Sequence, residues 1–138
     1  MRYAAKIAYD GSRFSGWQRQ PGVTRETVQE YVEEALELLN KSRTPVVAAG
    51  RTDRGVHALG QGVSFDVAAP WDPGKLRNAL DANLPPSISV IRTAPVTEVF
   101  SARRSASWRE YLYFVWKDHG CPPQFAPWVW KNTAPWAR

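Results

Sequence analysis

The sequence is poor in the residues that build disulfides and metal sites. Its 138 residues include one cysteine, Cys121, and two histidines. A single cysteine excludes an intrachain disulfide, and no Cys/His cluster has the spacing of metal ligands. No run of about 18 apolar residues could span a membrane, and the N-terminus lacks the long apolar core of a secretory signal. These absences predict a cytoplasmic protein without a structural metal.

The composition indicates a folded chain with a basic surface. It is 43% hydrophobic and 22% charged, which is enough apolar material to bury a core. The formal charge of +5 favours polyanionic partners such as RNA, although a charge of this size also serves simple solubility. Seven tryptophans are many for this length, and tryptophan concentrates in cores and at contact surfaces.

The spacing of apolar residues predicts two helices among several short strands. One helix is expected at 26–39, capped by Thr24, and a second at 74–83, opened by Pro73. Strands are expected at 3–9, 45–49, 61–67, 88–91 and 108–116. This order predicts an α+β fold, a ferredoxin-like βαββαβ sandwich with an antiparallel sheet and helices on one face. The glutamates of the first helix are interpreted as a solvated surface: Glu26, Glu30, Glu33, Glu34 and Glu37.

The regular pattern ends near Lys117. In the segment that follows, four prolines alternate with three tryptophans, so a regular helix is excluded there. We therefore predict a folded domain at 1–117 and a Pro/Trp-rich segment at 118–138, too aromatic for a flexible linker and expected to dock on another surface.

A candidate catalytic carboxylate lies in the glycine-flanked loop at 50–60. Asp53 stands between Arg51 and Arg54, and two nearby cations favour the ionised form of an aspartate. An ionised aspartate can act as a nucleophile or as a general base. Aspartate and glycine are also ordinary turn residues, so the residues alone leave open a turn beside two solvated arginines.

Six sequence blocks carry a resemblance to a known family. They are YDGSRFSGWQRQ at 9–20, TVQ at 27–29, GRTDRGVHALGQ at 50–61, NLP at 83–85, FSAR at 100–103 and REYLY at 109–113. In this order they resemble the motifs of the tRNA pseudouridine synthase A (TruA) family, and the third block resembles that family's signature loop. The resemblance covers residues 3–115.

The resemblance implies a fold, a reaction and a partner. The fold would be the first half of the pseudouridine synthase fold, with 118–138 as the start of a second half that this chain lacks. The reaction would isomerise uridine to pseudouridine at positions 38–40 of the tRNA anticodon stem-loop. It needs no cofactor, because no atoms are gained or lost. The full-length enzyme would be a homodimer that binds tRNA and no membrane.

The resemblance also assigns roles to individual residues. Asp53 would be the essential catalytic aspartate, and Arg51 would organise the site and the extruded nucleotide. Tyr111 would pack against the target base. Tyr113 falls on the same face of a strand, so only the motif selects Tyr111. Arg54 is expected to help keep the carboxylate ionised.

The loop at 13–20 mixes cations, aromatic rings and amides, as an RNA groove does. Arg13, Phe14, Trp17 and Gln18 are its candidate substrate contacts, although Phe14 and Trp17 could instead anchor the loop in the core. His57 is interpreted as a hydrogen-bonding or packing residue rather than a general base.

The sequence leaves open three chemical routes and one alternative function, and it disfavours two other functions. The aspartate could attack the sugar, attack the base, or remove a proton from the ribose. The chain could be a truncated, inactive tRNA-binding domain. An acylphosphatase-like hydrolase would want a phosphate-cradling glycine-rich loop after its first strand, and an RNA recognition motif would show its aromatic strand signature. The sequence has neither feature.

Overall fold

The computed structural model describes residues 1–20 and 26–134. The chain divides into two compact units, Met1–Ser107 and Trp108–Arg138, which are described separately. The division into domains at 1–117 and 118–138 stays a prediction. No helix in the described part of the chain is long and apolar enough to cross a membrane.

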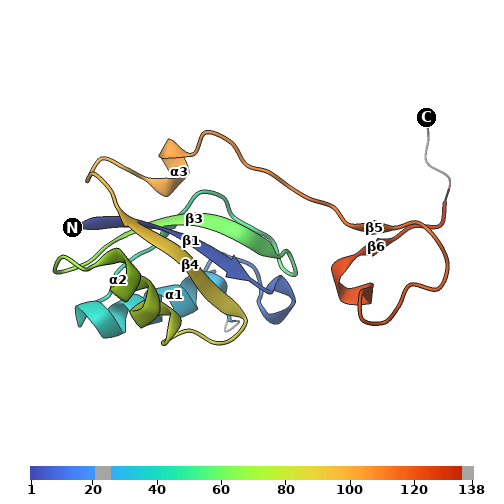
Figure 1. The fold of residues 1–138 in the computed structure, drawn as a ribbon, viewed down its shortest axis with the longest axis horizontal. Helices are drawn as coiled ribbons and strands as arrows, with labels where there is room; N and C mark the ends of the chain where they lie inside the picture. Colours follow the sequence, from blue (N-terminus) through green and yellow to red (C-terminus); the bar gives the residue numbers. More distant parts are fainter. Residues whose placement is uncertain (21–25, 135–138) are drawn as a thin grey trace. The chain divides into compact units, whose positions relative to one another are not determined.

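The first unit is built on a four-stranded sheet (Figure 1). Its strands are β1 (Arg2–Tyr9), β2 (Val47–Ala48), β3 (Ala58–Asp66) and β4 (Ile88–Pro95). They lie in the order β2-β3-β1-β4, and every neighbouring pair is antiparallel. β1 and β2 therefore run in the same direction with β3 between them, which is the split βαβ arrangement. The predicted α+β, ferredoxin-like sandwich is confirmed.

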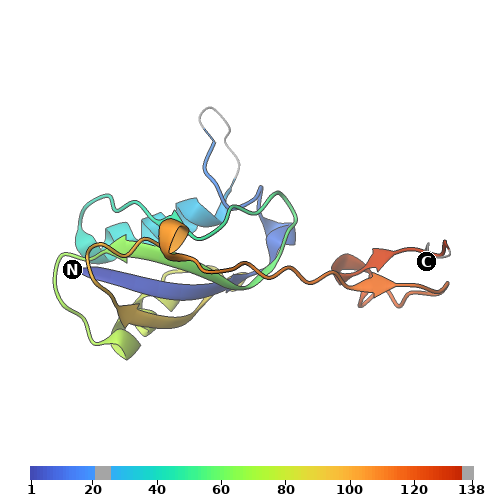
Figure 2. The same ribbon diagram turned by 90° about the horizontal axis from the view of Figure 1, so that it is seen from above.

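Two helices cover one face of this sheet. They are α1 (Val28–Asn40) and α2 (Pro73–Asp81), and Figures 1 and 2 show them on the same side. Alternate residues of β1 point into the core between sheet and helices, where Tyr3 and Ile7 are almost fully buried. The helices contribute apolar residues at helical spacing, with Val28 and Leu36 from α1 fully buried. The predicted apolar face of the first helix is therefore correct.

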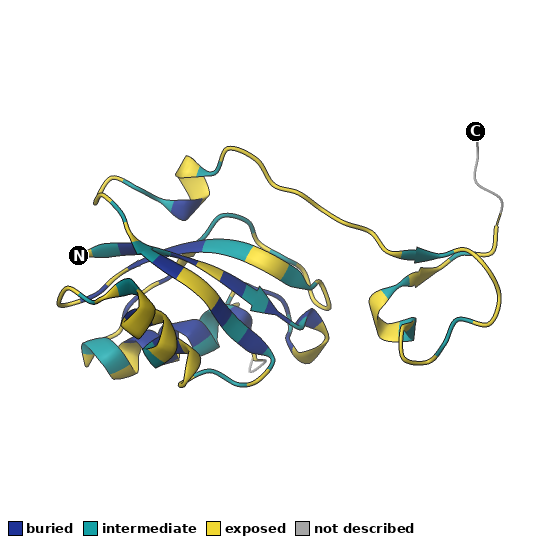
Figure 3. Cartoon of the chain, in the orientation of Figure 1, coloured by how far each residue is buried: buried dark blue, intermediate teal, exposed yellow. Residues whose placement is uncertain are grey.

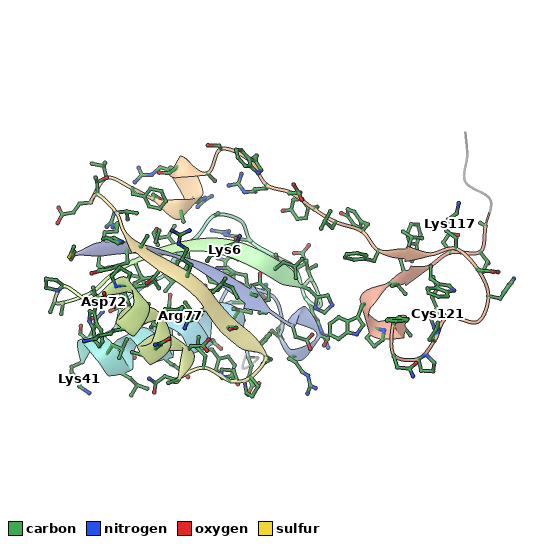
Figure 4. The ribbon with its side chains drawn as sticks, in the orientation of Figure 1. Lys6, Lys41, Asp72, Arg77, Lys117 and Cys121 are labelled. Atoms are coloured by element: carbon green, nitrogen blue, oxygen red, sulfur yellow. The ribbon has the colours of Figure 1, made fainter. Side chains whose placement is uncertain are left out.

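A third helix, α3 (Ala102–Ser105), lies on the opposite face of the sheet (Figures 1 and 2). Its first residue, Ala102, donates its N–H to the Ser64 hydroxyl oxygen at 3.0 Å. The sequence did not predict α3, because four residues are too few to show a helical period. Lys6, labelled in Figure 4, lies on this same face with its side chain across Gly60.

The backbone N–H groups at the start of α1 find hydrogen-bond partners in a capping box and in the preceding loop. Thr27 is the N-cap and exchanges hydrogen bonds with Glu30, whereas the predicted cap, Thr24, lies outside the described residues. The first two helical N–H groups, of Val28 and Gln29, donate to carbonyl oxygens of the loop at 3.2 and 3.0 Å. These N–H groups have no partner within the helix, so the bonds fix the loop against α1.

The interpretation of the α1 glutamates as solvated is wrong for one of them. Glu26, Glu34 and Glu37 are exposed, but Glu33 is buried, with 7% of its surface accessible. Its carboxylate faces three hydrogen-bond donors. A periodicity argument cannot detect this environment, because two of the donors, Val46 and Arg19, come from other segments.

The second unit has little regular structure. Its two-residue strands β5 (Val115–Trp116) and β6 (Trp130–Lys131) pair in parallel. Trp116 stacks on Phe125, with ring centroids 6.4 Å apart. The predicted strand at 108–116 is wrong over 108–114, which has no strand assignment and is exposed along its length (Figure 3). Alternating apolar residues form a strand only where a neighbouring strand completes the hydrogen bonds.

Candidate active site

Asp53 lies in the loop that connects β2 to β3. It opens a tight turn in which the Val56 N–H donates to the Asp53 carbonyl oxygen at 3.1 Å. Gly55 completes this turn with a φ of +81°, a conformation that favours glycine. The Asp53 side chain is exposed, so the turn presents the carboxylate to solvent.

The loop after β1 holds the backbone on both sides of Asp53. The Trp17 N–H donates to the Thr52 carbonyl oxygen at 3.0 Å. At Gly16, where φ is +102°, an added Cβ would lie 2.9 Å from the same oxygen and 3.3 Å from the Asp53 carbonyl carbon. At Gly11 a Cβ would overlap the Val56 carbonyl group. Two glycines therefore let one loop press directly on the backbone of the other.

Side chains add further bonds beneath the turn. The Tyr9 hydroxyl lies 2.6 Å from the Thr52 hydroxyl, one residue before Asp53. The Gly11 N–H donates to His57 Nδ1 at 3.0 Å, so this nitrogen acts as an acceptor. A direct bond from His57 to the Asp10 carboxylate, 3.4 Å away, would require a proton on the same nitrogen and would break the bond from Gly11. The hydrogen bond from the Gly11 N–H favours the predicted hydrogen-bonding role of His57.

Asp10 stabilises the start of this loop. Its carboxylate accepts hydrogen bonds from the Ser12 hydroxyl at 2.6 Å and from the Ser12 N–H at 3.1 Å. The bond from the hydroxyl is the largest cause that lowers the pKa of Asp10, and the charge of Arg13 lowers it further. An ionised Asp10 therefore keeps the 3₁₀ turn Gly11–Arg13 in place against His57.

The two arginines beside Asp53 are close in sequence but do not pair with it. Arg51, Asp53 and Arg54 are all exposed. Within residues 1–20 and 26–134, neither guanidinium group lies within 4.0 Å of the carboxylate. The two guanidinium groups are therefore not engaged by the Asp53 carboxylate. The described residues also contain no group of three or more His, Cys, Asp or Glu placed to hold a metal ion.

The other candidate contacts divide into exposed and buried residues. Arg13 and Gln18 are exposed, and the Arg13 guanidinium lies 3.9 Å from the Asp10 carboxylate. Phe14 and Trp17 are buried, with 6% and 2% of their surfaces accessible. Rings this deeply buried have no face free for a base, which favours the alternative that they anchor the loop. Phe14 packs edge-on against Tyr31 at 5.7 Å.

Tyr111 belongs to the second unit, where it is 60% exposed and Tyr113 is 83% exposed. Neither is a core residue of the described chain, and the base-packing role of Tyr111 stays a prediction. Sequence reasoning missed the supports of the Asp53 turn, namely Tyr9, Gly11, Gly16 and Thr52. A usable signal was present, because two glycines in a loop after a strand indicate close backbone approach.

Comparison with known proteins agrees with the motifs. Residues 5–103 match the tRNA pseudouridine synthase family. The chain is 44% identical over 135 residues to tRNA pseudouridine synthase A of Dinoroseobacter shibae, covering 97% of this chain and 52% of the relative. The same-named protein of Anaplasma marginale (strain Florida) is 46% identical over 124 residues, covering 89% and 50%. That of Cereibacter sphaeroides (strain KD131) is 47% identical over 113 residues, covering 81% and 44%.

The chain thus spans about half the length of the curated relatives it matches. The family match includes β1 from Ala5 onward, both large helices and the Asp53 turn. On these grounds the chain belongs to the tRNA pseudouridine synthase family.

Proposed function

We propose that this chain carries the catalytic aspartate of an enzyme that isomerises uridine to pseudouridine in tRNA. The target uridines are at positions 38–40 of the anticodon stem-loop, as the motif resemblance implies. The observation that supports the role of Asp53 most directly is its exposed carboxylate on a turn whose backbone is held on both sides. A turn held in this way keeps a reacting group in position without further ordering.

The reaction breaks the N1–C1′ bond of uridine and joins C5 to C1′. The hydrogen on C5 leaves to water and N1 takes up a proton, so the atoms balance without a cofactor. The target base must leave its stack, which costs a few kcal/mol. An exposed carboxylate such as that of Asp53 can reach an extruded nucleotide, whether it attacks the sugar, attacks the base or removes a ribose proton.

The exposed residues around the turn are the proposed substrate contacts. Arg13, Arg51 and Arg54 supply cations for phosphate oxygens, and Gln18 supplies an amide for a base edge or a phosphate. Tyr111 is proposed to stack on the target base, a contact worth about 1–3 kcal/mol per base. Phe14 and Trp17 take no part in these contacts and hold the loop that supports Asp53. The full-length protein is proposed to work as a homodimer.

The test is Asp53→Asn in the full-length protein that contains this chain. We expect tritium release from tRNA labelled at uridine C5 to stop, while tRNA binding stays within a few-fold. Asp118→Asn is the matched control, because Asp118 is exposed and lies outside the family match. Turnover by Asp53→Asn close to that of the control would remove Asp53 from the mechanism. Replacing the uridines at 38–40 one at a time tests the choice of target.

A further inference from the structure

Glu33 is the one charged residue in the buried class among the described residues. Its Oε1 accepts hydrogen bonds from the Val46 N–H at 3.1 Å and from Gln29 Nε2 at 3.0 Å. Its Oε2 lies 3.4 Å from Nη2 of Arg19. A buried carboxylate is costly unless it is paired and hydrogen-bonded, so this group is tied to specific partners.

Two of these partners, Val46 and Arg19, belong to the two segments that hold Asp53. Val46 directly precedes β2, and β2 leads into the loop that carries Asp53. Arg19 ends the stretch of loop that contacts that turn, and its own N–H donates to Gln29 Oε1 at 2.9 Å. Glu33 therefore joins the segment that enters the Asp53 loop to the segment that presses on it.

A short line of hydrogen bonds also runs from Glu33 to the residue before Asp53. Glu33 accepts from the Gln29 side chain at 3.0 Å. The Gln29 N–H donates to the Trp17 carbonyl oxygen at 3.0 Å, and the Trp17 N–H donates to the Thr52 carbonyl oxygen at 3.0 Å. Each link joins buried or half-buried groups, so a shift at one end is passed to the other.

We propose that Glu33 is a positioning residue for the Asp53 turn. This inference rests on the proposed function, since the positioned group is the catalytic carboxylate. A carboxylate suits this place because its Oε1 accepts hydrogen bonds from Val46 and Gln29, while its Oε2 forms the ion pair with Arg19. A glutamine side chain would turn an NH₂ group toward at least one of them and leave that donor unpaired. The second ion pair of Arg19, to Glu30, has its atoms 3.5 Å apart and involves neither Val46 nor Gln29, so it cannot replace these contacts.

The experiment compares Glu33→Gln with Glu34→Gln in the full-length protein that contains this chain. Glu34 is the adjacent residue of α1 and is exposed, so it controls for the same chemical change on the same helix. We expect Glu33→Gln to lower kcat about 10- to 100-fold with KM changed less than about threefold, because a displacement near 1 Å costs about 100-fold. Glu34→Gln should leave both within twofold of wild type.

Hydrogen exchange provides a readout that does not depend on activity. The amides of Trp17, Val46 and Val56 should exchange faster in Glu33→Gln and as in wild type in Glu34→Gln. If wild type has no isomerase activity, the proposed function fails, and the exchange data still decide the positioning role. A lower melting temperature for Glu33→Gln, with kcat and the exchange of Trp17 and Val56 equal to the control, would overturn the proposal.

A second variant covers the case in which Glu33→Gln does not fold. Arg19→Met removes one of the three donors at a side chain that is 36% exposed, so folding should survive. It should lower kcat several-fold and speed exchange at Trp17. Wild-type values for both measurements would count against the proposal. In a foldable Glu33→Gln background, adding Arg19→Met should lower kcat by less than it does alone, because the contact is already lost.

Discussion

Replacing Gly16 by alanine should move the turn that carries Asp53. An added Cβ would lie 2.9 Å from the Thr52 carbonyl oxygen and 3.3 Å from both the Arg54 nitrogen and the Asp53 carbonyl carbon. All three atoms belong to the backbone, so no change of side-chain rotamer can relieve the contacts. The turn must therefore yield by a few tenths of an ångström, and the Trp17–Thr52 hydrogen bond must stretch with it.

The expected magnitude has two parts. Alanine at a φ of +102° takes up a sparsely populated backbone conformation, which costs about 1–3 kcal/mol. The close contacts add an overpacking cost of about 1–3 kcal/mol. We therefore expect Gly16→Ala to lower the free energy of unfolding by about 2–6 kcal/mol. The shift of the turn is smaller than the 1 Å displacement that costs about 100-fold, so kcat should fall about tenfold.

Alanine substitutions at two other glycines distinguish the cost of backbone strain from the cost of close contacts. Gly55 has a φ of +81° but no atom within 4 Å of an added Cβ, so Gly55→Ala should show the strain cost alone. At Gly62 the nearest atom is the Ala49 Cβ at 3.6 Å, an ordinary contact, and Gly62→Ala should be close to neutral. Urea unfolding gives the stabilities and tritium release gives kcat. Equal unfolding free energies for Gly16→Ala and Gly55→Ala, with kcat of Gly16→Ala unchanged, would refute the reasoning.

Two further outcomes follow from the ion pair of the sheet and from the exposed aromatic segment. Asp66 lies opposite Arg2 and accepts two hydrogen bonds from it at 3.0 Å, the main cause that lowers the pKa of Asp66 below 3.8. Its stabilising contribution should be complete above pH 3.8 and lost as pH falls through the lower folded value. The difference in urea unfolding between wild type and Asp66→Asn should then shrink in acid, and a constant difference would contradict this. For Tyr111, replacement by Phe should reduce activity less than replacement by Ala, since stacking needs the ring; equal damage in single-turnover assays would reject stacking.

Local periodicity predicted the elements in which the spacing of apolar residues matches the side chains that are buried. In β1 alternate residues are buried, and in α1 the apolar residues recur at helical spacing, so both elements were expected within two residues of their observed bounds. Asp53 was also identified from the sequence, because it lies in the block GRTDRGVHALGQ at 50–61. Each of these signals lies within a dozen residues.

The remaining features depend on contacts between distant segments. Glu33 has the spacing of a solvated residue, and only the donors of Val46 and Arg19 explain its burial. Gly11 and Gly16 are required by the backbone of a loop some 40 residues away. The segment 108–114 is rich in aromatic residues, as strands are, but no strand in the described part of its unit pairs with it. The sequence pattern alone does not show which distant residues form these contacts.

The place of β1 in the sheet sets the order in which the site can be completed during synthesis. β1 leaves the ribosome first, yet its neighbours β3 and β4 end only at Asp66 and Pro95. Both of its edges are unpaired until β3 is made, and one remains unpaired until β4 is made; unpaired edges invite pairing with other chains. The β2–β3 hairpin can form earlier, but its Asp53 turn gains support only when the loop after β1 docks on it. The nascent chain thus passes through a stage with secondary structure and an unformed active site, in which aggregation and proteolysis compete with folding.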